Sequence, residues 1–304
     1  MEAPAAAGNL LSFLLADKSV RGVILHGTKL VEEMRHCHEL DSLETLLLGQ
    51  ALQVTVLMAS TLKGQDEIGL RIDCAGPIKG LVTEATASGE VRGYLQRNPM
   101  PPAASLAALD NTNNFNSCQR DGLLTVSRIA GHNKQAFRGS ITLQSGHIAS
   151  EVARYYLLSE QIPTAIHLSL RFDSQERLTG AGGLLLQALP GASATIFAQI
   201  EQMTNNLPSL GQALAEGQQV EPWLNRQFAH FQPAVLAKRP VHFRCRCSDQ
   251  QMHFLLYQLP LANLDEMQAN GPFPIEVNCH YCNKKYLFTQ ADLAKISREK
   301  QASC

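Results

Sequence analysis

The sequence predicts a protein in three parts: an α/β (α+β) N-terminal core domain over residues 1–190, a helical, metastable linker over 191–240, and a small C-terminal zinc-binding module over 241–304. Three observations support this division. Strand-like and helix-like segments alternate as far as about residue 190. The next segment is poor in charge and is interrupted by proline and glycine, and the last contains two close pairs of cysteines.

The most apolar stretch of the first part is predicted to be a buried helix over 41–63. Asp41 and Glu44 stand at capping-box spacing at its start, as they do in helices of water-soluble proteins. The stretch is close to the length of a membrane span, about 20 residues. It nevertheless contains Glu44, Gln50 and Gln53. We therefore expect a core helix, and a protein without membrane contacts.

Seven short runs between turn signals are strand candidates. They cover residues 68–74, 78–85, 90–96, 123–129, 137–144, 165–172 and 182–189. Helical patterns occupy the region around 29–40 and residues 147–161, and a loop rich in proline, asparagine and serine covers 98–121. Strands in hairpins beside a few long helices predict a mixed α+β core.

The linker carries apolar residues at helical spacing but contains many helix-breaking residues. The apolar residues form two sets, which are Ile196, Phe197, Ile200 and Met203, and then Trp223, Leu224, Phe228 and Phe231. Short helices of this kind are marginal in isolation. They are expected to pack against a neighbouring part of the chain.

The last part is predicted to contain helices around a hairpin. Ser248 and Gln251 give a helix start, and Thr289 and Asp292 cap a final helix. Between them, residues 274–288 alternate as a hairpin does, and the second cysteine pair lies at its turn.

The two pairs, Cys245-x-Cys247 and Cys279-x-x-Cys282, have the number and spacing of ligands for one zinc ion per chain. Zinc prefers four thiolates in a tetrahedron, and a C-x-x-C turn directs two sulfurs to one side. Basic residues that flank the pairs would favour thiolates, namely Arg244, Arg246, Lys284 and Lys285. Inert core cysteines are the alternative interpretation.

The same cysteines offer a route for oxidation. Cys245 can pair with Cys247, and Cys279 with Cys282, and the tighter C-x-C disulfide should be strained and readily reduced. A module of this size buries too little surface to be stable without its metal. Oxidation would therefore eject zinc and unfold the module, and the linker would lose a neighbour.

Two other classes of protein remain possible at this point, a zinc-ribbon nucleic-acid-binding protein and a thiol-disulfide oxidoreductase. The formal net charge of −1 gives no electrostatic case for a nucleic-acid partner. No nucleophile, base and acid combine in a pattern typical of an enzyme. The remaining cysteines, Cys37, Cys74, Cys118 and Cys304, are scattered without a pairing pattern, which favours a reducing, cytoplasmic setting.

The cysteine arrangement, followed by "YCNKKYLF", resembles the redox-regulated heat-shock chaperone family of about 33 kDa, the 33 kDa chaperonins. Further blocks resemble the same family: "SVRG", "ASTLKGQDEIGLRIDCAGPIKGLV", "YYLLSEQIPT" and "AGGLLLQALPGA". The resemblance extends over residues 18–296. Family members commonly have glycine where this chain has Asn283, a residue type that also tolerates positive φ.

This resemblance implies a cytoplasmic stress-response holdase that is inactive when reduced and zinc-bound. It also implies that oxidation forms two disulfides, releases zinc, unfolds the module and linker, and favours homodimers that hold unfolded or oxidatively damaged client proteins. Cys245, Cys247, Cys279 and Cys282 would then be both zinc ligands and redox-active residues. Contacts with clients are expected in the linker and on the adjacent face of the core.

Overall fold

The computed structural model describes residues 8–75, 78–96, 122–130 and 136–302. The loop predicted over 98–121 lies outside these residues, as do Cys118 and Cys304. The chain divides into two compact units, Met1–Arg244 and Cys245–Cys304.

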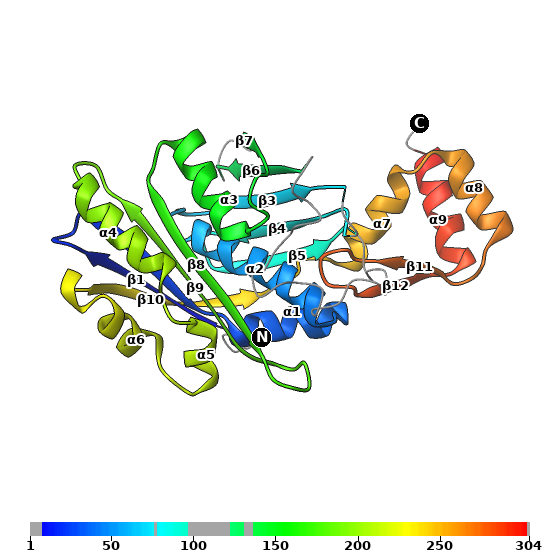
Figure 1. The fold of residues 1–304 in the computed structure, drawn as a ribbon. Helices are drawn as coiled ribbons and strands as arrows, with labels where there is room; N and C mark the ends of the chain where they lie inside the picture. Colours follow the sequence, from blue (N-terminus) through cyan, green and yellow to red (C-terminus); the bar gives the residue numbers. More distant parts are fainter. Residues whose placement is uncertain (1–7, 76–77, 97–121, 131–135, 303–304) are drawn as a thin grey trace. The chain divides into compact units, whose positions relative to one another are not determined.

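The first unit is built on a ten-stranded sheet with the order β7-β6-β3-β4-β5-β10-β1-β2-β9-β8 (Figure 1). Its strands are β1 (Gly8–Leu15), β2 (Val20–His26), β3 (Glu67–Asp73), β4 (Gly80–Thr86), β5 (Glu90–Leu95), β6 (Leu123–Ile129), β7 (Ala136–Thr142), β8 (Thr164–Phe172), β9 (Leu178–Ala188) and β10 (Ala234–Phe243). All seven strand candidates form strands. The sequence analysis did not identify β1 and β2.

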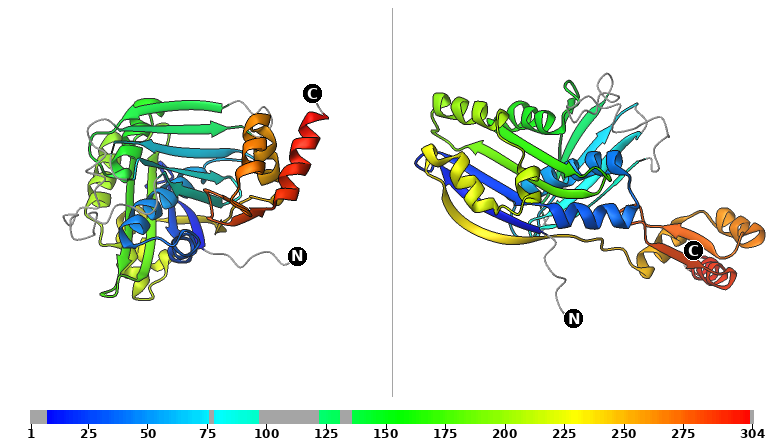
Figure 2. Two further views of the ribbon diagram at one scale, coloured as in Figure 1. Left: turned by 90° about the vertical axis from the view of Figure 1, so that its right-hand side faces the viewer. Right: turned by 60° about the horizontal axis from the view of Figure 1, so that its bottom comes forward.

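β10 lies in the middle of this sheet, although its residues were assigned partly to the linker and partly to the C-terminal module. It pairs antiparallel with β1, from Gly8 opposite Val241 to Leu14 opposite Ala234. It also pairs in parallel with β5 at His242 and Phe243. Figure 2 shows β10, in yellow, running beside β1, in dark blue. Proline and charged residues hide this strand in the sequence, and pairing with distant strands is what stabilises it.

The helices of the first unit are α1 (Thr28–His38), α2 (Ser42–Ala59), α3 (Ile148–Tyr155), α4 (Ala194–Asn205), α5 (Leu210–Ala215) and α6 (Val220–Gln227). A π-helical turn, Tyr156–Glu160, continues α3, and the 3₁₀ turn Ala229–Phe231 follows α6. The capping box of Asp41 and Glu44 is present, and every residue of α2 is buried. α2 is long and apolar enough to cross a membrane, yet it is wholly enclosed in this unit. The prediction of a core helix is confirmed.

Strand β9 shows how helices cover both faces of the sheet. A Cβ atom on Gly182 would lie 2.7 Å from the side chain of Leu210 in α5, whereas one on Gly183 would lie 3.0 Å from Leu57 in α2. Successive residues of a strand point to opposite faces. The α5 helix and the α2 helix therefore pack on opposite faces of β9, and both approach its backbone closely.

The helices of the predicted linker join a large apolar cluster with the sheet. This cluster comprises Leu11, Phe13, Leu15, Val20, Ile24, Ala165, Leu184, Leu186, Phe197, Ile200, Leu210, Ala213, Leu214, Val220, Trp223, Leu224, Phe228 and Phe231. Trp223 is the only tryptophan of the chain and is 1% exposed. The prediction that the short helices pack against a neighbour is confirmed. In this state they lie within the first compact unit, and the separate boundaries at 190 and 240 stay a prediction.

The second unit contains α7 (Asp249–Gln258), α8 (Leu261–Asn270), α9 (Gln290–Gln301) and a hairpin of β11 (Ile275–Asn278) and β12 (Lys285–Phe288). Ser248 accepts a hydrogen bond from the Gln251 N–H at 3.3 Å, and Thr289 and Asp292 form a capping box, so both predicted helix starts are confirmed. The unit's core is small. It consists of Met252, Leu256, Leu264, Cys279, Tyr286, Phe288, Leu293 and Ile296.

Candidate metal centre

The four predicted ligands come together in the second unit. The Sγ atoms of Cys245, Cys247, Cys279 and Cys282 all lie within 4.8 Å of one another. The Sγ atoms of Cys245 and Cys279 are 3.6 Å apart, and those of Cys247 and Cys282 are 3.4 Å apart. None of the four is disulfide-bonded. In the part of the chain that the structure describes, this is the one group of candidate metal ligands.

Local backbone geometry positions the second pair. Residues 279–284 form the turn between β11 and β12, in which the Cys279 N–H donates to the Lys284 carbonyl at 3.0 Å. The N–H groups of Cys282 and Asn283 both donate to the carbonyl of Cys279. Asn283 has φ of 58°, so asparagine takes the left-handed conformation that glycine often provides. The prediction that this turn survives the substitution is confirmed.

The sulfur cluster fits a tetrahedral zinc ion. A Zn–S distance of about 2.3 Å places tetrahedral ligands about 3.8 Å apart. The sulfur separations of 3.4 and 3.6 Å, within a group no wider than 4.8 Å, are close to that value. Four soft donors with no oxygen or nitrogen ligand among them favour zinc over magnesium or calcium.

The electrostatics of the cluster also favour a cation. Burial raises the pKa of Cys279 to about 11 and also raises the pKa of Cys282. Burial opposes ionisation of Cys247 as well, but a hydrogen bond from Tyr286 and contacts with the other sulfurs lower its pKa. Four neighbouring thiols therefore ionise poorly together without a positive charge. A divalent cation among them supplies that charge and stabilises the thiolates.

Hydrogen bonds to sulfur come from the backbone and from one side chain. The N–H groups of Tyr281 and Lys284 hydrogen-bond to the sulfurs of Cys279 and Cys282 respectively. The Tyr286 hydroxyl donates to Cys247 Sγ at 3.1 Å. The sequence analysis missed Tyr286. Its signal was its place in β12, where alternation directs every second residue to the core.

The flanking basic residues are only partly directed at the sulfurs. Lys285 Nζ lies 3.0 Å from Glu276 Oε1. Arg244, in the first unit, has its Nη1 atom 2.7 Å from Glu90 Oε1. The Lys284 ammonium lies 4.7 Å from the centre of the Tyr286 ring. Two of the four predicted counter-charges thus pair with carboxylates, and the backbone N–H groups take over part of the expected role.

The remaining cysteines differ in their state. Cys74 is disulfide-bonded in the structure, although the sequence showed no pairing pattern for it. A disulfide requires Cα atoms within about 7 Å, and distance along the chain does not reveal that proximity. Cys37, in α1, is not disulfide-bonded.

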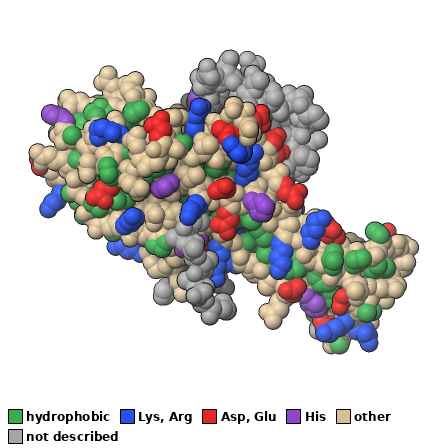
Figure 3. Space-filling view, turned by 90° about the horizontal axis from the view of Figure 1, so that it is seen from below, with side chains coloured by type: hydrophobic (Ala, Val, Ile, Leu, Met, Phe, Trp, Pro, Cys, Tyr) green, Lys and Arg blue, Asp and Glu red, His purple; other side chains and the backbone are tan. Residues whose placement is uncertain are grey.

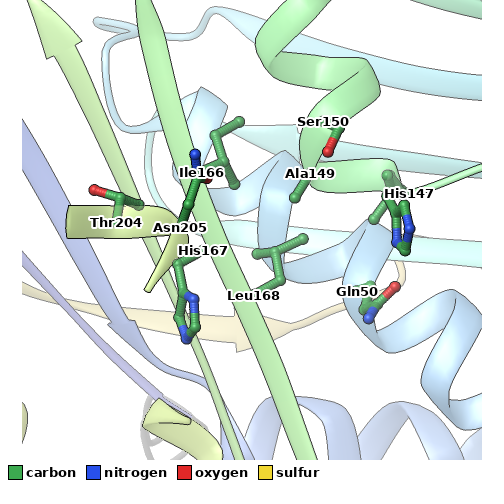
Figure 4. Close-up of a pocket in the computed structure, with 10 residues that line it drawn as sticks. Gln50, His147, Ala149, Ser150, Ile166, His167, Leu168, Thr204 and Asn205 are labelled. Atoms are coloured by element: carbon green, nitrogen blue, oxygen red, sulfur yellow. The ribbon is translucent and has the colours of Figure 1, made fainter. Parts of the chain in front are cut away.

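A polar pocket of about 280 Å³ lies between α3, β8 and α4 in the first unit. Figure 4 shows His147 and Gln50 on one side of the view, and His167 and Asn205 on the other. His167 Nε2 is buried, and no hydrogen-bond partner is found for it in the described part of the chain. Sequence reasoning did not identify this pocket, because its lining residues come from segments far apart in the chain.

Comparison with known proteins places the chain in a family. Residues 8–289 match the family described as Hsp33 protein. The 33 kDa chaperonin of Desulforamulus reducens is 32% identical over 292 residues, covering 94% of this chain and 96% of that protein. The 33 kDa chaperonin of Lactobacillus delbrueckii subsp. bulgaricus is 33% identical over 292 residues, covering 96% and 98%.

A solved structure gives the same result. The crystal structure of the 33 kDa chaperonin (heat shock protein 33 homolog) from Thermotoga maritima superposes with a TM-score of 0.86 at 27% identity, covering 97% of this chain and 99% of that one. The mixed α/β fold and the resemblance stated from the cysteine motifs are both confirmed. The chain belongs to the Hsp33 family of chaperones.

Proposed function

We propose that this protein is a redox-switched holdase that binds unfolding proteins after oxidation and is inactive when reduced and zinc-bound. The observation that carries the proposal is the position of the sulfur cluster within the core of the second unit. Cys279 belongs to its apolar cluster, and Cys245, Cys247 and Cys282 pack against that cluster. Chemistry at these sulfurs therefore acts on the fold itself.

Hydrogen peroxide is a sufficient oxidant for the switch. A thiolate attacks one peroxide oxygen, so an S–O bond forms, the O–O bond breaks, and hydroxide leaves and is protonated to water. A second thiolate then attacks the sulfenic sulfur, forming the S–S bond and releasing another hydroxide. Each disulfide consumes one peroxide. Two disulfides remove all four ligands that would hold zinc.

We propose that the disulfides join Cys245 to Cys247 and Cys279 to Cys282. The shortest sulfur contacts in the folded unit instead join Cys245 to Cys279 and Cys247 to Cys282. Once oxidation of the first thiolate breaks the ligand set, the unit opens, and sulfurs separated by only one or two intervening residues along the chain meet most often. Peptide mapping of the oxidised protein tests this pairing, and disulfides across the two pairs would contradict it.

Unfolding of the second unit would then destabilise the linker helices. Strand β10 ends at Phe243, two residues before the first ligand Cys245, so the chain leads directly from sheet to sulfur cluster. The layer of α4, α5 and α6 covers a large apolar cluster that includes Trp223 and Phe228. We propose that its release exposes the surface that holds client proteins, and that the exposed surface also favours homodimers.

The decisive experiment follows zinc, structure and client aggregation in one series. Reduced, zinc-loaded protein is treated with hydrogen peroxide, and released zinc is measured with a colorimetric chelator. We expect about one zinc per chain, a red shift of Trp223 emission, loss of helical circular dichroism from the C-terminal third, and suppression of aggregation of a thermally unfolding enzyme. Size-exclusion chromatography with light scattering reports dimers.

Single-cysteine variants give matched controls. Cys282→Ser should abolish zinc binding, whereas Cys37→Ser, at a cysteine of α1 outside the cluster, should leave it intact. A protein that releases zinc but does not suppress aggregation would contradict the holdase proposal. Catalytic turnover of small disulfides by the reduced protein would instead support a thiol-disulfide oxidoreductase.

We propose no nucleic-acid partner and no membrane partner. Acidic and basic side chains are interspersed on the face of the molecule shown in Figure 3. Two arginines that precede the first cysteine pair are engaged within the first unit: Arg239 donates to the Ala87 carbonyl at 2.8 Å, and Arg244 pairs with Glu90. Salt-dependent binding of RNA or DNA by the reduced protein would contradict this point. A cytoplasmic setting, where thiols stay reduced, suits a switch that responds to oxidant.

A further inference from the structure

Tyr286 is a buried residue of the second unit whose hydroxyl contacts the sulfur cluster. It lies in β12, opposite Val277 of β11, and is only 3% exposed. The neighbouring residue Leu287 points outward and is 60% exposed. The register of the hairpin therefore fixes the ring of Tyr286 inside the apolar cluster, beside the sulfurs.

The hydroxyl of Tyr286 makes a specific contact with one sulfur. It donates a hydrogen bond to Cys247 Sγ at 3.1 Å, and that sulfur lies 3.4 Å from Cys282 Sγ. Cys247 precedes α7, whereas Tyr286 and Cys282 belong to the hairpin. The bond thus links the two halves of the ligand set. Lys284, 4.7 Å from the centre of the ring, restrains the ring by a cation–π contact.

A hydrogen bond to a ligand sulfur has two chemical consequences. It orients the ligand and shares the negative charge of a thiolate, as partners of metal ligands do at other metal sites. It also stabilises the negative charge on the sulfur and so lowers its nucleophilicity towards an electrophile. In a buried site such a bond is stronger than in water.

We propose that Tyr286 is a positioning residue of the switch, whose hydroxyl holds Cys247 in the ligand set and slows its attack on peroxide. The effect on the attack on peroxide rests on the proposed redox function, whereas the positioning of Cys247 does not. In the step concerned, Cys247 sulfur forms a bond to a peroxide oxygen, the O–O bond breaks, and the departing hydroxide becomes water. The hydrogen bond from Tyr286 weakens as negative charge leaves the sulfur on the way to that transition state, so it stabilises the thiolate more than the transition state.

The test compares Tyr286→Phe with Tyr257→Phe. The first removes only the hydroxyl and keeps the buried ring. The second removes a hydroxyl from a tyrosine of the same unit that is packed against the same cluster. In reduced full-length protein, competition with a chelator should show zinc binding about 10–100-fold weaker for Tyr286→Phe. Peroxide should release its zinc about 2–10-fold faster, the range expected for one hydrogen bond. Tyr257→Phe should match the parent protein.

A spectroscopic readout separates positioning from packing. With Co²⁺ in place of zinc, the sulfur-to-cobalt charge-transfer band should move to lower energy in Tyr286→Phe and stay in place in Tyr257→Phe. Incorporation of 3-fluorotyrosine at position 286 keeps the fold and strengthens the donor. It should shift the band and the peroxide rate in the opposite direction.

Unchanged zinc affinity, band position and release rate in both Tyr286→Phe and the 3-fluorotyrosine protein would overturn the proposal. The affinity and the cobalt band are measured without oxidant or client, so their failure is distinguishable from failure of the holdase function. A changed affinity with an unchanged peroxide rate would overturn the kinetic half alone.

Discussion

The two units of this protein are stabilised by different physical means. In the first, all residues of α2 are buried between sheet and neighbouring helices. In the second, α7 buries Met252 and Leu256, while Phe254 and Leu255 are 56% and 52% exposed. Apolar burial suffices for the first unit. The second has a small apolar core that contains Cys279 and packs against the other three cysteines, so we expect its stability to depend on what those sulfurs bind.

The linker helices share features of both units. α6 buries Trp223 in the large cluster of the first unit, yet the preceding helix, α5, has only six residues, Leu210–Ala215. Helices this short do not persist alone, and their stability comes from packing. The layer is folded because the sheet lies beneath it. The layer therefore depends on its contacts with the sheet, whereas α2 is enclosed on all sides.

The largest expected effect is the loss of the metal site, which would test the contrast directly. Cys279→Ser removes a ligand that is also a core residue, and structural zinc contributes about 10–16 kcal/mol of apparent binding energy in small domains. We expect amides of residues 245–302 to exchange with solvent as in an unfolded chain, while amides of α2 stay protected. Hydrogen exchange read by mass spectrometry measures this. Continued protection of α9 in the variant would contradict the metal-dependent fold.

Much of this contrast could be predicted from the sequence, because its signals are local. The cysteine spacing predicted a group of four sulfurs, which the structure brings together, and the Asp41–Glu44 and Thr289–Asp292 pairs predicted helix starts that the structure contains. Local side-chain chemistry sets a cap or a turn, so short motifs predict it. The positive φ of Asn283 is another example.

Features that depend on pairing between distant segments could not be predicted. β10 is stabilised by β1, more than 200 residues away in the chain, and its own residues include Pro240. The hydrogen bond from Tyr286 to Cys247 depends on the register of a hairpin relative to a separate loop. Neither arrangement leaves a periodic pattern in the sequence.

The second expected effect concerns the linker layer. Trp223→Ala removes a large side chain that is 1% exposed, and such truncations cost about 3–5 kcal/mol. We expect urea unfolding of the first unit at lower denaturant concentration, and unchanged zinc affinity. Trp223→Phe, which retains an aromatic ring, should lower the free energy of unfolding of the first unit clearly less. Equal losses in the two variants would show that α6 contributes little packing energy.

A third effect distinguishes the units by pH. Burial lowers the pKa of His167 to about 4 from its usual 6.5. Between these values the unfolded chain binds a proton that the folded unit excludes, so stability is fully present above about pH 6.5 and falls as the pH drops towards 4. The loss is at most about 3 kcal/mol. The free energy of unfolding, measured with urea at several pH values in this range, should depend less steeply on pH in His167→Gln than in the parent protein. An identical pH dependence in the two proteins would contradict burial of a neutral imidazole.

The smallest effect is at a helix cap, where the two units should respond through different observables. Thr289 accepts a hydrogen bond from the Asp292 N–H at 3.3 Å at the start of α9, and Ser193 accepts one from Ile196 at the start of α4. Replacing either by alanine costs about 1 kcal/mol. We propose that folding and metal binding are one equilibrium in the second unit, so Thr289→Ala should weaken zinc binding about fivefold.

The matched change Ser193→Ala should lower the urea midpoint of the first unit and leave zinc affinity unchanged. The two cap variants should therefore differ in which measured quantity changes, and not in the size of the free-energy loss. If Thr289→Ala left zinc affinity unchanged, the second unit would have to be folded before the metal binds. Oxidation of its cysteines would then release zinc without unfolding the unit, and the route from sulfur chemistry to an exposed linker would be broken at its first step.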